Sequence, residues 1–352
     1  MHDKNIKIIK NMITITTNAR MLERNTFGID VQAELFGEYE NIEGLRMILS
    51  NPLVEHRKHD IWNIGQGSNI LFSGDFKGII LHGKIKGIKV VGEDDSSVLV
   101  KIGAGEIWDD IVEWAVDHNY YGAENLSAIP GEVGAAAVQN IGAYGSEFGN
   151  LVESVEVLNT ETLQKELIAK DNCQYGYRES IFKHQPVKQR YVVTGVVIRL
   201  SKKESFNLEY GNIKSALEGK QINLHNVRKA IVEIRTNKLP DWKKLGNAGS
   251  FFKNPIISQE QFEQIKELYP NVPSYKVEGK IPMVKVPAGW LIENSGLKGF
   301  CHGGAHVYEK QCLVLINTGN AKAKDIVELS DIVIRTVKEK FNIEISPEVN
   351  IL

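Results

Sequence analysis

The chain has 352 residues, of which 42% are hydrophobic and 24% are charged, and its 42 Lys and Arg against 44 Asp and Glu give a net charge of −2 at pH 7. This length predicts roughly two or three domains with cores of their own, and the balanced charge excludes a strongly basic, nucleic-acid-binding chain. The longest stretches without Asp, Glu, Lys or Arg, at 61–74 and 133–146, have 14 residues each. They are too short for a membrane-spanning helix, which needs about 18 residues or more.

Cysteine content and the N-terminus indicate the compartment. Cys173, Cys301 and Cys312 are too few for a disulfide framework in a chain of this size, and none belongs to a Cys-x-x-Cys pair. The N-terminus lacks the continuous apolar run and the small-residue cleavage site of a secretory signal. We therefore expect a cytoplasmic protein, with Met1 or Met12 as the start.

Short β-branched runs alternate with amphipathic segments along the chain, a pattern that predicts an α+β protein. The predicted strands are 60–64, 79–81, 98–102, 152–158 and 191–200, and the predicted helices are 106–118, 223–238, 258–268 and 321–340. A polar turn at Tyr210-Gly211-Asn212 follows the charged run 201–205 and predicts a linker, so that a second half of the chain begins near residue 210.

Two of the predicted helices show a clear apolar face. The helix at 106–118 has Asn119 where a C-terminal cap belongs, and its apolar positions are Ile107, Ile111, Trp114 and Ala115. The helix at 321–340 is expected to bury one stripe, which consists of Ile326, Leu329, Val333, Val337 and Phe341.

A glycine-containing turn lies between two predicted strands. Gly65, Gly67, Ser68 and Asn69 could direct backbone N–H groups at an anion such as a phosphate. The segment lacks the third glycine of a dinucleotide-binding fingerprint, since Ile70 stands there, and no Gly-Lys-Ser/Thr follows it. A purely structural tight turn therefore remains the alternative to a phosphate cradle.

Two further glycine segments follow. Gly103 and Gly105 stand where a predicted strand hands over to the helix at 106–118, so that the first amides of the helix could face a ligand, or the glycines could form only a turn. The segment 122–149 contains six glycines and six alanines in 28 residues. So bare a backbone suits the close approach of a large planar ligand, and the alternative is a Gly/Ala-packed loop between core elements.

In this order, the three glycine segments resemble the two-lobed flavin-binding module of the vanillyl-alcohol-oxidase type. The resemblance implies an FAD diphosphate at Gly65, Gly67, Ser68 and Asn69, with lobes at about 24–85 and 86–201. It implies further cofactor contacts from Gly103, Gly105, Ile129, Pro130, Gly131, Gly134, Gln139, Asn140, Ile141, Gly142, Ala143, Tyr144 and Gly145. The segment 122–149 contains neither His nor Cys, so the FAD is expected to be non-covalent.

Six further segments carry distinctive motifs: CQYGYRES at 173–180, LEYG at 208–211, KLP at 238–240, GNAGSFFKNP at 246–255, PAGWLI at 287–292 and SPEV at 346–349. Through these segments, the chain from about residue 25 to its C-terminus resembles one family within that class, the UDP-N-acetylenolpyruvoylglucosamine reductases of bacterial peptidoglycan precursor synthesis. Several independent motifs thus agree on one family.

Membership in this family implies an oxidoreductase that acts on a CH–CH bond and reduces the enolpyruvyl group of a UDP-sugar. It implies an N-terminal extension at 1–23, an FAD module at 24–201 and a C-terminal α+β substrate domain at 210–352. The resemblance also implies that NADPH is the hydride donor and uses the same flavin face as the sugar in turn, and the absence of a separate Rossmann fingerprint agrees with that order. The sequence leaves NADPH against NADH open; we expect a monomer without a nucleic-acid or membrane partner.

The reaction of this family has three demands: a cation for the substrate carboxylate, a proton donor for the neighbouring carbon, and a group that helps polarise the adduct. Arg178, Ser250 and Glu348 match the family residues for these roles in motif context. From the residues alone, Arg178 could be a surface arginine, Ser250 a turn serine, and Glu348 an exposed carboxylate at a strand end.

The resemblance also assigns five residues to the substrate. These are Tyr177, Tyr210, Lys238, Asn254 and, as the weakest match, Gln311. Tyr177 and Tyr210 resemble the long-loop subtype, in which a tyrosine loop folds over the bound substrate. A lysine and a tyrosine hydroxyl suit a diphosphate, whereas a solvated lysine and a packed tyrosine are the alternatives.

Cys301, His302 and His306 offer metal-ligating atoms, but Gly303-Gly304 between them argues against the helix that would bring the histidines together. We therefore predict no metal site. Two other functions remain alternatives: a different flavin oxidase with the same module, and a non-catalytic nucleotide-sugar-binding protein that kept the fold.

Overall fold

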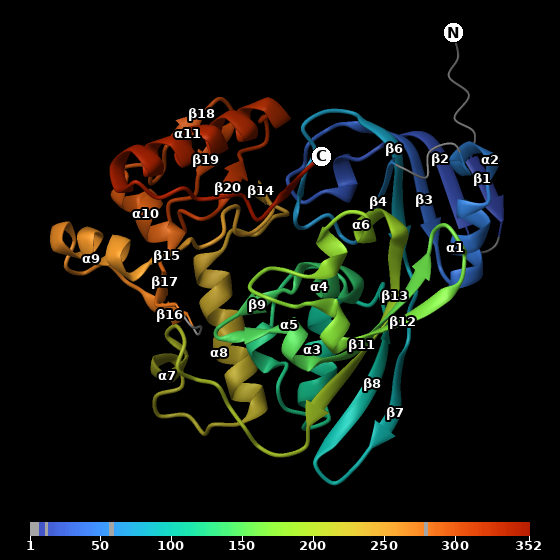
Figure 1. Cartoon of the computed structure of the whole chain (residues 1–352), viewed down its shortest axis with the longest axis horizontal. Coiled ribbons are helices and arrows are strands. Elements are labelled where there is room, and N and C mark those ends of the chain that lie inside the picture. Colours follow the sequence, from blue (N-terminus) through green and yellow to red (C-terminus); the bar gives the residue numbers. More distant parts are fainter. Residues whose placement is uncertain (1–6, 11–12, 56–59, 278–280) are drawn as a thin grey trace. The chain divides into compact units, whose positions relative to one another are not determined.

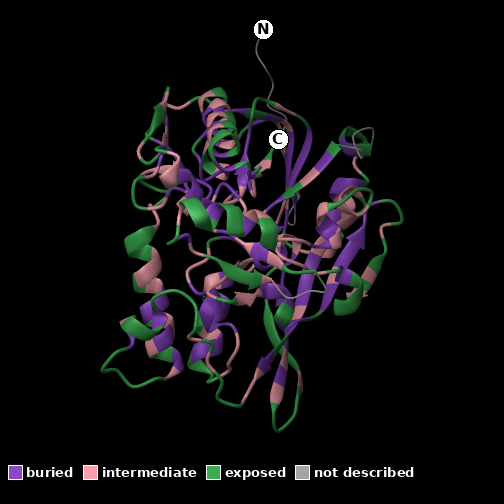
Figure 2. Ribbon diagram, turned by 60° about the vertical axis from the view of Figure 1, so that its left-hand side comes forward, coloured by how far each residue is buried: buried purple, intermediate pink, exposed green. Residues whose placement is uncertain are grey.

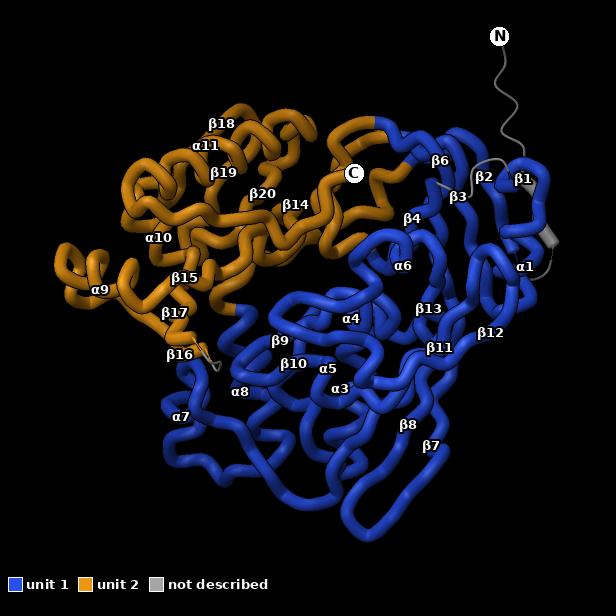
Figure 3. The backbone as a smooth tube through the Cα atoms, viewed as in Figure 1, with its two compact units in different colours: residues 1–20, 32–66, 75–236 blue, residues 21–31, 67–74, 237–352 orange. Residues whose placement is uncertain are grey.

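The computed structural model describes residues 7–10, 13–55, 60–277 and 281–352, and it contains two compact units (Figure 3). Unit 1 comprises residues 1–20, 32–66 and 75–236, and unit 2 comprises 21–31, 67–74 and 237–352. These units follow contacts within the chain, and the predicted modules at 24–201 and 210–352 stay a prediction. Met1 and Met12 lie outside the described residues.

The first sheet of unit 1 combines antiparallel and parallel pairs in the order β1-β2-β3-β6-β4 (Figure 1). Its strands are β1 (Lys7–Lys10), β2 (Ile13–Arg20), β3 (Gln32–Tyr39), β6 (Phe76–Gly83) and β4 (Ile61–Ile64). β6 runs parallel to both β3 and β4, and parallel neighbours need a crossover between them. Helices α1 (Ile42–Leu49) and α2 (Pro52–Glu55) form part of that connection, and α1 begins at Asn41, whose side chain accepts a hydrogen bond from the Gly44 amide at 2.9 Å.

The second sheet of unit 1 is antiparallel throughout, in the order β12-β11-β13-β8-β7. Its strands are β12 (Lys165–Ala169), β11 (Val152–Asn159), β13 (Tyr191–Ser201), β8 (Ser97–Gly103) and β7 (Ile88–Glu93). Val98, Val100 and Ile102 of β8 alternate with more exposed residues and are fully buried, as expected of a strand with one face on the core. Figure 2 shows buried residues along the strands, whereas the loops are largely exposed.

Three helices pack into the core of this second sheet: α3 (Trp108–Asp117), α4 (Val133–Gln139) and α5 (Phe148–Leu151). The Trp108 and Phe148 rings meet edge to face at 4.9 Å, and the Trp108 indole donates to the Leu126 carbonyl at 3.0 Å. Both side chains are completely buried. The buried tryptophan is thus fixed by packing and by a hydrogen bond.

The predicted helix at 106–118 is confirmed, and Asn119 ends it with a left-handed φ of 57°. Its apolar face differs from the prediction, because the helix begins one residue after its cap, Ile107, and turns Trp108 into the core. Trp114 is only half-buried and lies against His118, with ring centroids 4.5 Å apart.

Unit 1 ends with α7 (Ile213–Ala216) and most of α8 (Leu224–Lys238). The predicted turn at residues 210–212 lies between β13 and α7, and Gly211 has a φ of +66° there. A small core joins the two helices and consists of Ile213, Leu217, Val227, Ala230 and Ile231.

The described residues of unit 2 form two small antiparallel sheets, one two-stranded parallel pair and three longer helices. The sheets are β14 (Gly246–Asn247), β20 (Leu315–Asn317), β19 (Ala305–Val307), β18 (Cys301–His302) and, separately, β15 (Ile256–Ser258), β17 (Met283–Lys285), β16 (Tyr275–Val277). The parallel pair is β21 (Asn350–Ile351) with β5 (Ile70–Leu71), and the helices are α9 (Gln259–Leu268), α10 (Ala288–Asn294) and α11 (Ala323–Phe341). Tyr269, Trp290 and Phe341 pack their rings together at 5.3–5.6 Å.

The short remaining elements are connections. They are η1 (Leu22–Arg24), η3 (Glu124–Leu126), β9 (Gly142–Ala143), β10 (Ser146–Glu147), η4 (Lys170–Cys173), η5 (Ile181–Lys183) and α6 (Val187–Arg190). In the part of the chain that the structure describes, no helix has the length and apolar character to cross a membrane.

The predicted strands and helices are confirmed within one to three residues at their ends. The stripe of α11 is confirmed as well, since Ile326, Leu329, Val333, Val337 and Phe341 are all buried. The prediction missed β2, which lies in the segment expected to be an N-terminal extension and buries Ile13, Ile15 and Ala19.

Candidate cofactor and substrate site

Backbone contacts shape the predicted phosphate turn. Gly67 has a φ of +68°, and a Cβ there would lie 2.2 Å from the Arg24 carbonyl oxygen in the same unit. The Gly67 carbonyl accepts a hydrogen bond from the Thr26 amide at 3.2 Å. Gly67 is therefore required by the close approach of residues 24–26, whatever ligand the turn holds.

Gly103 and Gly105 are also required by close approaches of the backbone. A Cβ at Gly103 would lie 2.3 Å from the Ile85 carbonyl oxygen, and one at Gly105 would lie 2.6 Å from that of Gly83. Their amides donate to Gly87 and Ile85, respectively, both at 2.9 Å. These amides already have acceptors within the chain, so the turn interpretation explains both glycines.

The glycine- and alanine-rich segment 122–149 is only partly a loop. Its centre is the helix α4, which buries Val133, Gly134, Ala136 and Ala137. A Cβ on Gly134 would lie 2.9 Å from the Ala104 Cβ, so the glycine allows the helix to pack closely on the end of β8. The bare backbone of 133–139 therefore serves helix packing, and the assignment of Gly134 and Gln139 to the flavin stays a prediction.

The loop before α4 is held from two sides. Asp109 accepts the Ala128 amide at 2.6 Å and forms a bidentate ion pair with Arg228 of α8, at 2.6 and 3.0 Å. The Gly131 amide donates to the Gln66 side-chain oxygen at 3.0 Å. Ala128 itself has a left-handed φ of 57°. The loop that contains the predicted flavin contacts at Ile129, Pro130 and Gly131 is thus fixed by polar side chains.

The hairpin β9–β10 carries the next predicted flavin contacts. Tyr144 and Gly145 form its turn with φ of 48° and 79°. A Cβ on Gly145 would lie 2.3 Å from the Tyr210 ring, so Tyr210 packs on this turn although 38% of it is exposed. The structure thereby brings one predicted substrate residue beside predicted flavin contacts within unit 1.

Arg178 lies against the same hairpin. Its Nη2 donates to the Gly142 carbonyl at 2.6 Å, and its guanidinium carbon lies 5.4 Å from the Tyr177 ring centroid. Arg178 has a left-handed φ of 55°, and its carbonyl accepts a hydrogen bond from Lys183 at 2.8 Å. The structure therefore places Arg178 beside the predicted flavin segment, half-buried rather than extended into solvent.

Asn140 organises these two loops. Its side chain is buried, donates to the Gly176 carbonyl at 2.7 Å and to Glu147 at 2.9 Å, and accepts the Gly149 amide at 2.7 Å. The amide side chain thus satisfies both donors and one acceptor. Asn140 joins the hairpin to the turn that carries Arg178.

The residues of the segment fit a flavin. The side-chain oxygens of Gln139 and Asn125 are buried and have no hydrogen-bond partner among the described residues, and such orphaned acceptors match the N–H groups of a ligand. Ile129, Ile141 and Ala143 pack on the core of the second sheet but stay half-buried. This combination of orphaned acceptors and apolar surface is typical of a site for a planar heteroaromatic ring.

Two of the three predicted catalytic residues, Ser250 and Glu348, belong to unit 2, and backbone hydrogen bonds join the segments around them. The Glu348 amide donates to the Phe251 carbonyl at 2.7 Å, and the Lys253 amide donates to the Ser346 carbonyl at 2.9 Å. Ser250 directly precedes this pairing and is half-buried, as is Glu348. The structure thus brings the ends that carry Ser250 and Glu348 together, while Arg178 belongs to unit 1.

Asn247 builds the turn before Ser250. Its side chain accepts the Gly249 amide at 2.9 Å and donates to the Leu245 carbonyl at 2.8 Å, while its backbone carbonyl accepts the Thr26 hydroxyl at 2.6 Å. Ser250 therefore directly follows a turn that is fixed on both sides.

Asn254 and Gln311 both lie at the start of α10. The Asn254 side chain accepts the Ala288 amide at 2.9 Å, and the Gln311 side-chain oxygen lies 2.9 Å from where a Cβ on Gly289 would stand. Lys238, the last residue of α8, is exposed. Two of the predicted substrate residues thus lie beside the same end of one helix in unit 2.

Arg235 is a residue that the sequence prediction missed. Its Nε donates to the Ala128 carbonyl at 3.3 Å. Burial lowers the pKa of Arg235 and raises that of Tyr144, and the electrostatic interaction between the two groups opposes both shifts. Arg228 and Arg235 are seven residues apart and thus share a helix face, a spacing that could have drawn attention to them.

Cys301, His302 and His306 lie on the hairpin β18–β19 rather than on a helix. Cys301 faces His306 in the register, whereas His302 pairs with Glu328 at 2.9 Å. In the described part of the chain, no group of three or more His, Cys, Asp or Glu gathers in a way that could hold a metal ion.

Two family models match the chain and define the class of protein to which it belongs. Residues 52–163 match the family model described as FAD binding domain. Residues 241–352 match the model described as UDP-N-acetylenolpyruvoylglucosamine reductase, C-terminal domain. The chain is an FAD-binding oxidoreductase, with the α+β fold that the alternation of β-branched and amphipathic segments predicted.

Full-length relatives define the family. The chain is 47% identical to UDP-N-acetylenolpyruvoylglucosamine reductase of Bacteroides fragilis strain YCH46, over 94% of this chain and 98% of the relative. It is 42% identical to the Flavobacterium johnsoniae protein of the same name, over 96% and 99%. The chain therefore belongs to the UDP-N-acetylenolpyruvoylglucosamine reductase family, as predicted, which excludes a different flavin oxidase family.

A solved structure agrees on the fold. The crystal structure of UDP-N-acetylenolpyruvylglucosamine reductase from Thermus caldophilus is similar with a TM-score of 0.64, over 95% of this chain and 97% of that one. Because the identity is 23%, this likeness speaks for the fold alone.

Proposed function

We propose that this chain reduces UDP-N-acetylenolpyruvoylglucosamine to UDP-N-acetylmuramate with NADPH, as a cytoplasmic monomer in peptidoglycan precursor synthesis. The near-full-length identity to reductases of that name supports the substrate. The geometric observation that carries the proposal is the Arg178 guanidinium on the Gly142 carbonyl, inside the segment assigned to the flavin.

We assign FAD to the module 24–201 and the sugar to the module 210–352. The residues that would hold FAD are Gly65, Gly67, Ser68, Asn69, Gly103, Gly105, Ile129, Pro130, Gly131, Gly134 and 139–145. When bound, FAD supplies the hydride that the enol ether receives at its terminal carbon. For Gly103, Gly105 and Gly131, whose amides have acceptors in the chain, contact would come from the bare Cα surface rather than from N–H groups.

Arg178 would hold the substrate carboxylate. A planar guanidinium grips a carboxylate through two parallel hydrogen bonds and stays charged at all working pH values. Negative charge that develops on the carbon next to the carboxylate is then spread toward a fixed cation, which lowers the barrier only if the cation is already in place. The contacts of Arg178 to Gly142 and of Lys183 to the Arg178 carbonyl supply that fixation.

Ser250 would give its hydroxyl proton to this carbon, and Glu348 would help polarise the adduct. The turn built by Asn247 and the pairing of Phe251 with Glu348 support a fixed position for both groups. Tyr177, Tyr210, Lys238, Asn254 and Gln311 would bind the diphosphate and the sugar.

Absorbance and turnover test this function. The purified protein should show a flavin spectrum and should oxidise NADPH faster when the enolpyruvyl UDP-sugar is added, and NADH in parallel measures the preference between the two donors. A protein that binds FAD and the UDP-sugar without NADPH oxidation would support the non-catalytic alternative. A protein that binds no FAD would refute the cofactor assignment.

Ser250→Ala tests the division of roles, because the proton is needed in only one half-reaction. Bleaching of the flavin by NADPH should keep its rate in stopped flow, while reoxidation by the enolpyruvyl UDP-sugar should slow by about 100-fold or more. Ser250→Cys should recover part of this rate. Equal losses in both half-reactions, or normal reoxidation, would show that Ser250 is not the proton donor.

A further inference from the structure

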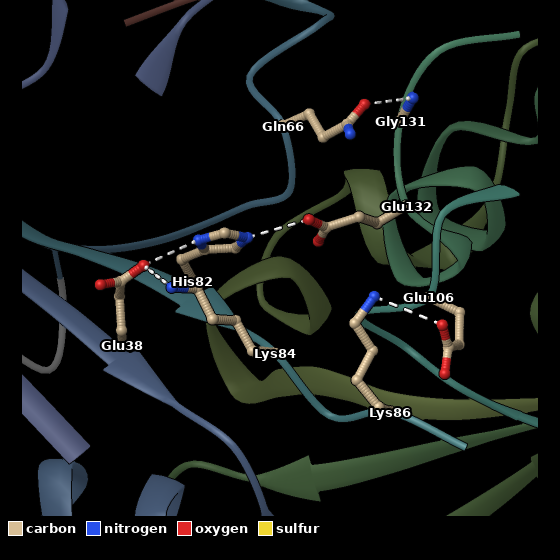
Figure 4. A network of polar contacts seen from close by, with 8 residues as sticks. All are labelled: Glu38, Gln66, His82, Lys84, Lys86, Glu106, Gly131 and Glu132. Carbon is tan, nitrogen blue, oxygen red and sulfur yellow. Dashed lines mark hydrogen bonds and ion pairs between the residues drawn. The ribbon is translucent and has the colours of Figure 1, made fainter. Parts of the chain in front are cut away.

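His82, at the end of β6, lies between two carboxylates (Figure 4). Its Nδ1 is 3.3 Å from the Glu38 Oε1, and its Nε2 is 2.9 Å from the Glu132 Oε1. The three side chains are 17%, 22% and 9% exposed, in the order His82, Glu38 and Glu132. Since ionised carboxylates only accept hydrogen bonds, both ring nitrogens must donate, and the ring is an imidazolium.

Glu132 places this cluster beside two segments to which FAD contacts are assigned. Glu132 follows the loop of Ile129, Pro130 and Gly131 directly, and its Oε2 is 3.0 Å from where a Cβ on Gly65 would stand. The Gln66 oxygen accepts the Gly131 amide at 3.0 Å beside it, as Figure 4 shows. Glu132 thus lies between two segments to which FAD contacts are assigned, and His82 ties it to strands β3 and β6 of the first sheet.

The charges of the cluster cancel. Glu38 also pairs with Lys84 at 2.7 Å, so two carboxylates face two cations. Without the charge of His82, Glu132 would be an almost buried carboxylate beside Gly65, one of the residues assigned to the anionic diphosphate. Both the burial and the like charge would disfavour that state.

The ionisation of the ring follows from these neighbours. Burial by itself would lower the pKa of His82, but the hydrogen bonds to Glu132 and Glu38 outweigh it and raise the pKa to about 9. The groups that face the cluster are Glu38 and Tyr39 from β3, Lys84 after β6, and Glu132 before α4; burial, followed by the charge of Glu132, raises the pKa of Tyr39.

We propose that His82 is a positioning residue for FAD: its charged ring fixes Glu132, and with it the loop 129–131 beside Gly65 and Gln66, and cancels the charge of Glu132 toward the cofactor diphosphate. This inference rests on the FAD contacts assigned above to those two segments. In this role, His82, Glu38 and Glu132 affect the binding of FAD and take no part in the chemical steps of the reaction.

Titration of the apoprotein with FAD, followed by flavin fluorescence, tests the role of His82 without any turnover. His82→Gln should weaken FAD binding about tenfold or more at pH 7, because a neutral amide leaves the charge of Glu132 uncompensated. Glu132→Gln keeps a hydrogen bond to His82 and should bind FAD nearly as the wild type. The double variant removes both charges and should recover most of the affinity lost in His82→Gln.

Two controls separate charge from packing. His302→Gln removes a His–Glu pair of the same 2.9 Å distance in unit 2 and should leave FAD affinity unchanged. Thermal unfolding of each apoprotein reports whether a variant folds.

The pH dependence of FAD binding is a further test. The FAD affinity of the wild type should fall as the pH rises through about 9, and the double variant, which lacks the histidine, should not show this fall.

Three results would overturn the proposal. They are a His82→Gln variant with wild-type FAD affinity, a double variant as weak as the single one, and wild-type and double-variant pH profiles that coincide. If His82→Gln does not fold, the comparison of pH profiles decides. A wild-type protein that binds no FAD would instead refute the cofactor assignment, so the two failures are distinguishable.

Discussion

Gly67→Ala probes the close backbone approach in the predicted phosphate turn. A Cβ there would lie 2.2 Å from the Arg24 carbonyl oxygen and 2.8 Å from the Asn25 Cα, with φ at +68°. Ordinary contacts to carbon need about 3.5 Å. The atoms in the way are backbone atoms, so they cannot rotate aside as a flexible side chain would.

The expected loss of stability has two parts. A left-handed conformation costs an L-residue about 1–2 kcal/mol, and forcing an extra carbon into a packed site costs about 1–3 kcal/mol. Gly67→Ala should therefore lower the free energy of unfolding by about 2–5 kcal/mol. Gly296 in the same unit has φ of +78° and no atom within 4 Å of a Cβ, so Gly296→Ala should show the first part only.

Urea unfolding of the apoproteins measures both losses. If Gly67→Ala costs no more than Gly296→Ala, the close approach of residues 24 and 25 is wrong. The unfolding measurements are also needed to interpret an FAD-binding assay, because Gly67→Val should lose FAD through damage to the turn itself. Loss of flavin in that variant then does not distinguish a phosphate cradle from a structural turn.

Three further predictions concern charged groups. Arg178→Lys should lower kcat/KM by about tenfold or more, because an ammonium cannot grip a carboxylate bidentately; normal kinetics would refute that geometry. Asp109→Asn should cost about 2–4 kcal/mol in urea unfolding, since Arg228 is only 14% exposed, whereas Glu153→Gln, in an exposed pair, should cost less than about 1 kcal/mol. His82 has its pKa raised from 6.5 to about 9, so its charged form should contribute about 3 kcal/mol to stability. This contribution should be complete below pH 6.5 and should be lost as the pH rises through 9; unchanged stability between pH 7 and 10 in wild type relative to His82→Gln would contradict it.

Local periodicity explains what could be predicted from the sequence. The helix α11 buries the stripe that its spacing indicates, because one helix face decides which residues meet the core. The glycine segments were also recognisable, since glycine is costly where nothing requires it. The group that lies against each glycine could not be predicted, because a missing Cβ indicates a close approach without showing what approaches. At Gly67, Gly103 and Gly134 the structure shows the chain itself in that place.

Polar pairs between distant residues could not be predicted in this way. His82 meets Glu38 and Glu132 across 44 and 50 residues of sequence, and Asp109 meets Arg228 across 119. No periodicity relates such positions, since only the folded topology makes them neighbours. The motif resemblance therefore identified residues assigned to the substrate and the flavin, but not the residues that hold them.

Asn140, which the resemblance itself assigned to the flavin, shows why the contacts that hold the site matter for the proposed reaction. Its side chain joins the hairpin assigned to the flavin to the turn 176–179 that carries Arg178, through the Gly149 amide, Glu147 and the Gly176 carbonyl. Arg178 then returns to the same hairpin through the Gly142 carbonyl. One buried amide thus fixes the cation and the flavin segment relative to each other, and because hydride addition and charge stabilisation must occur at adjacent carbons, an error in that spacing would impair both.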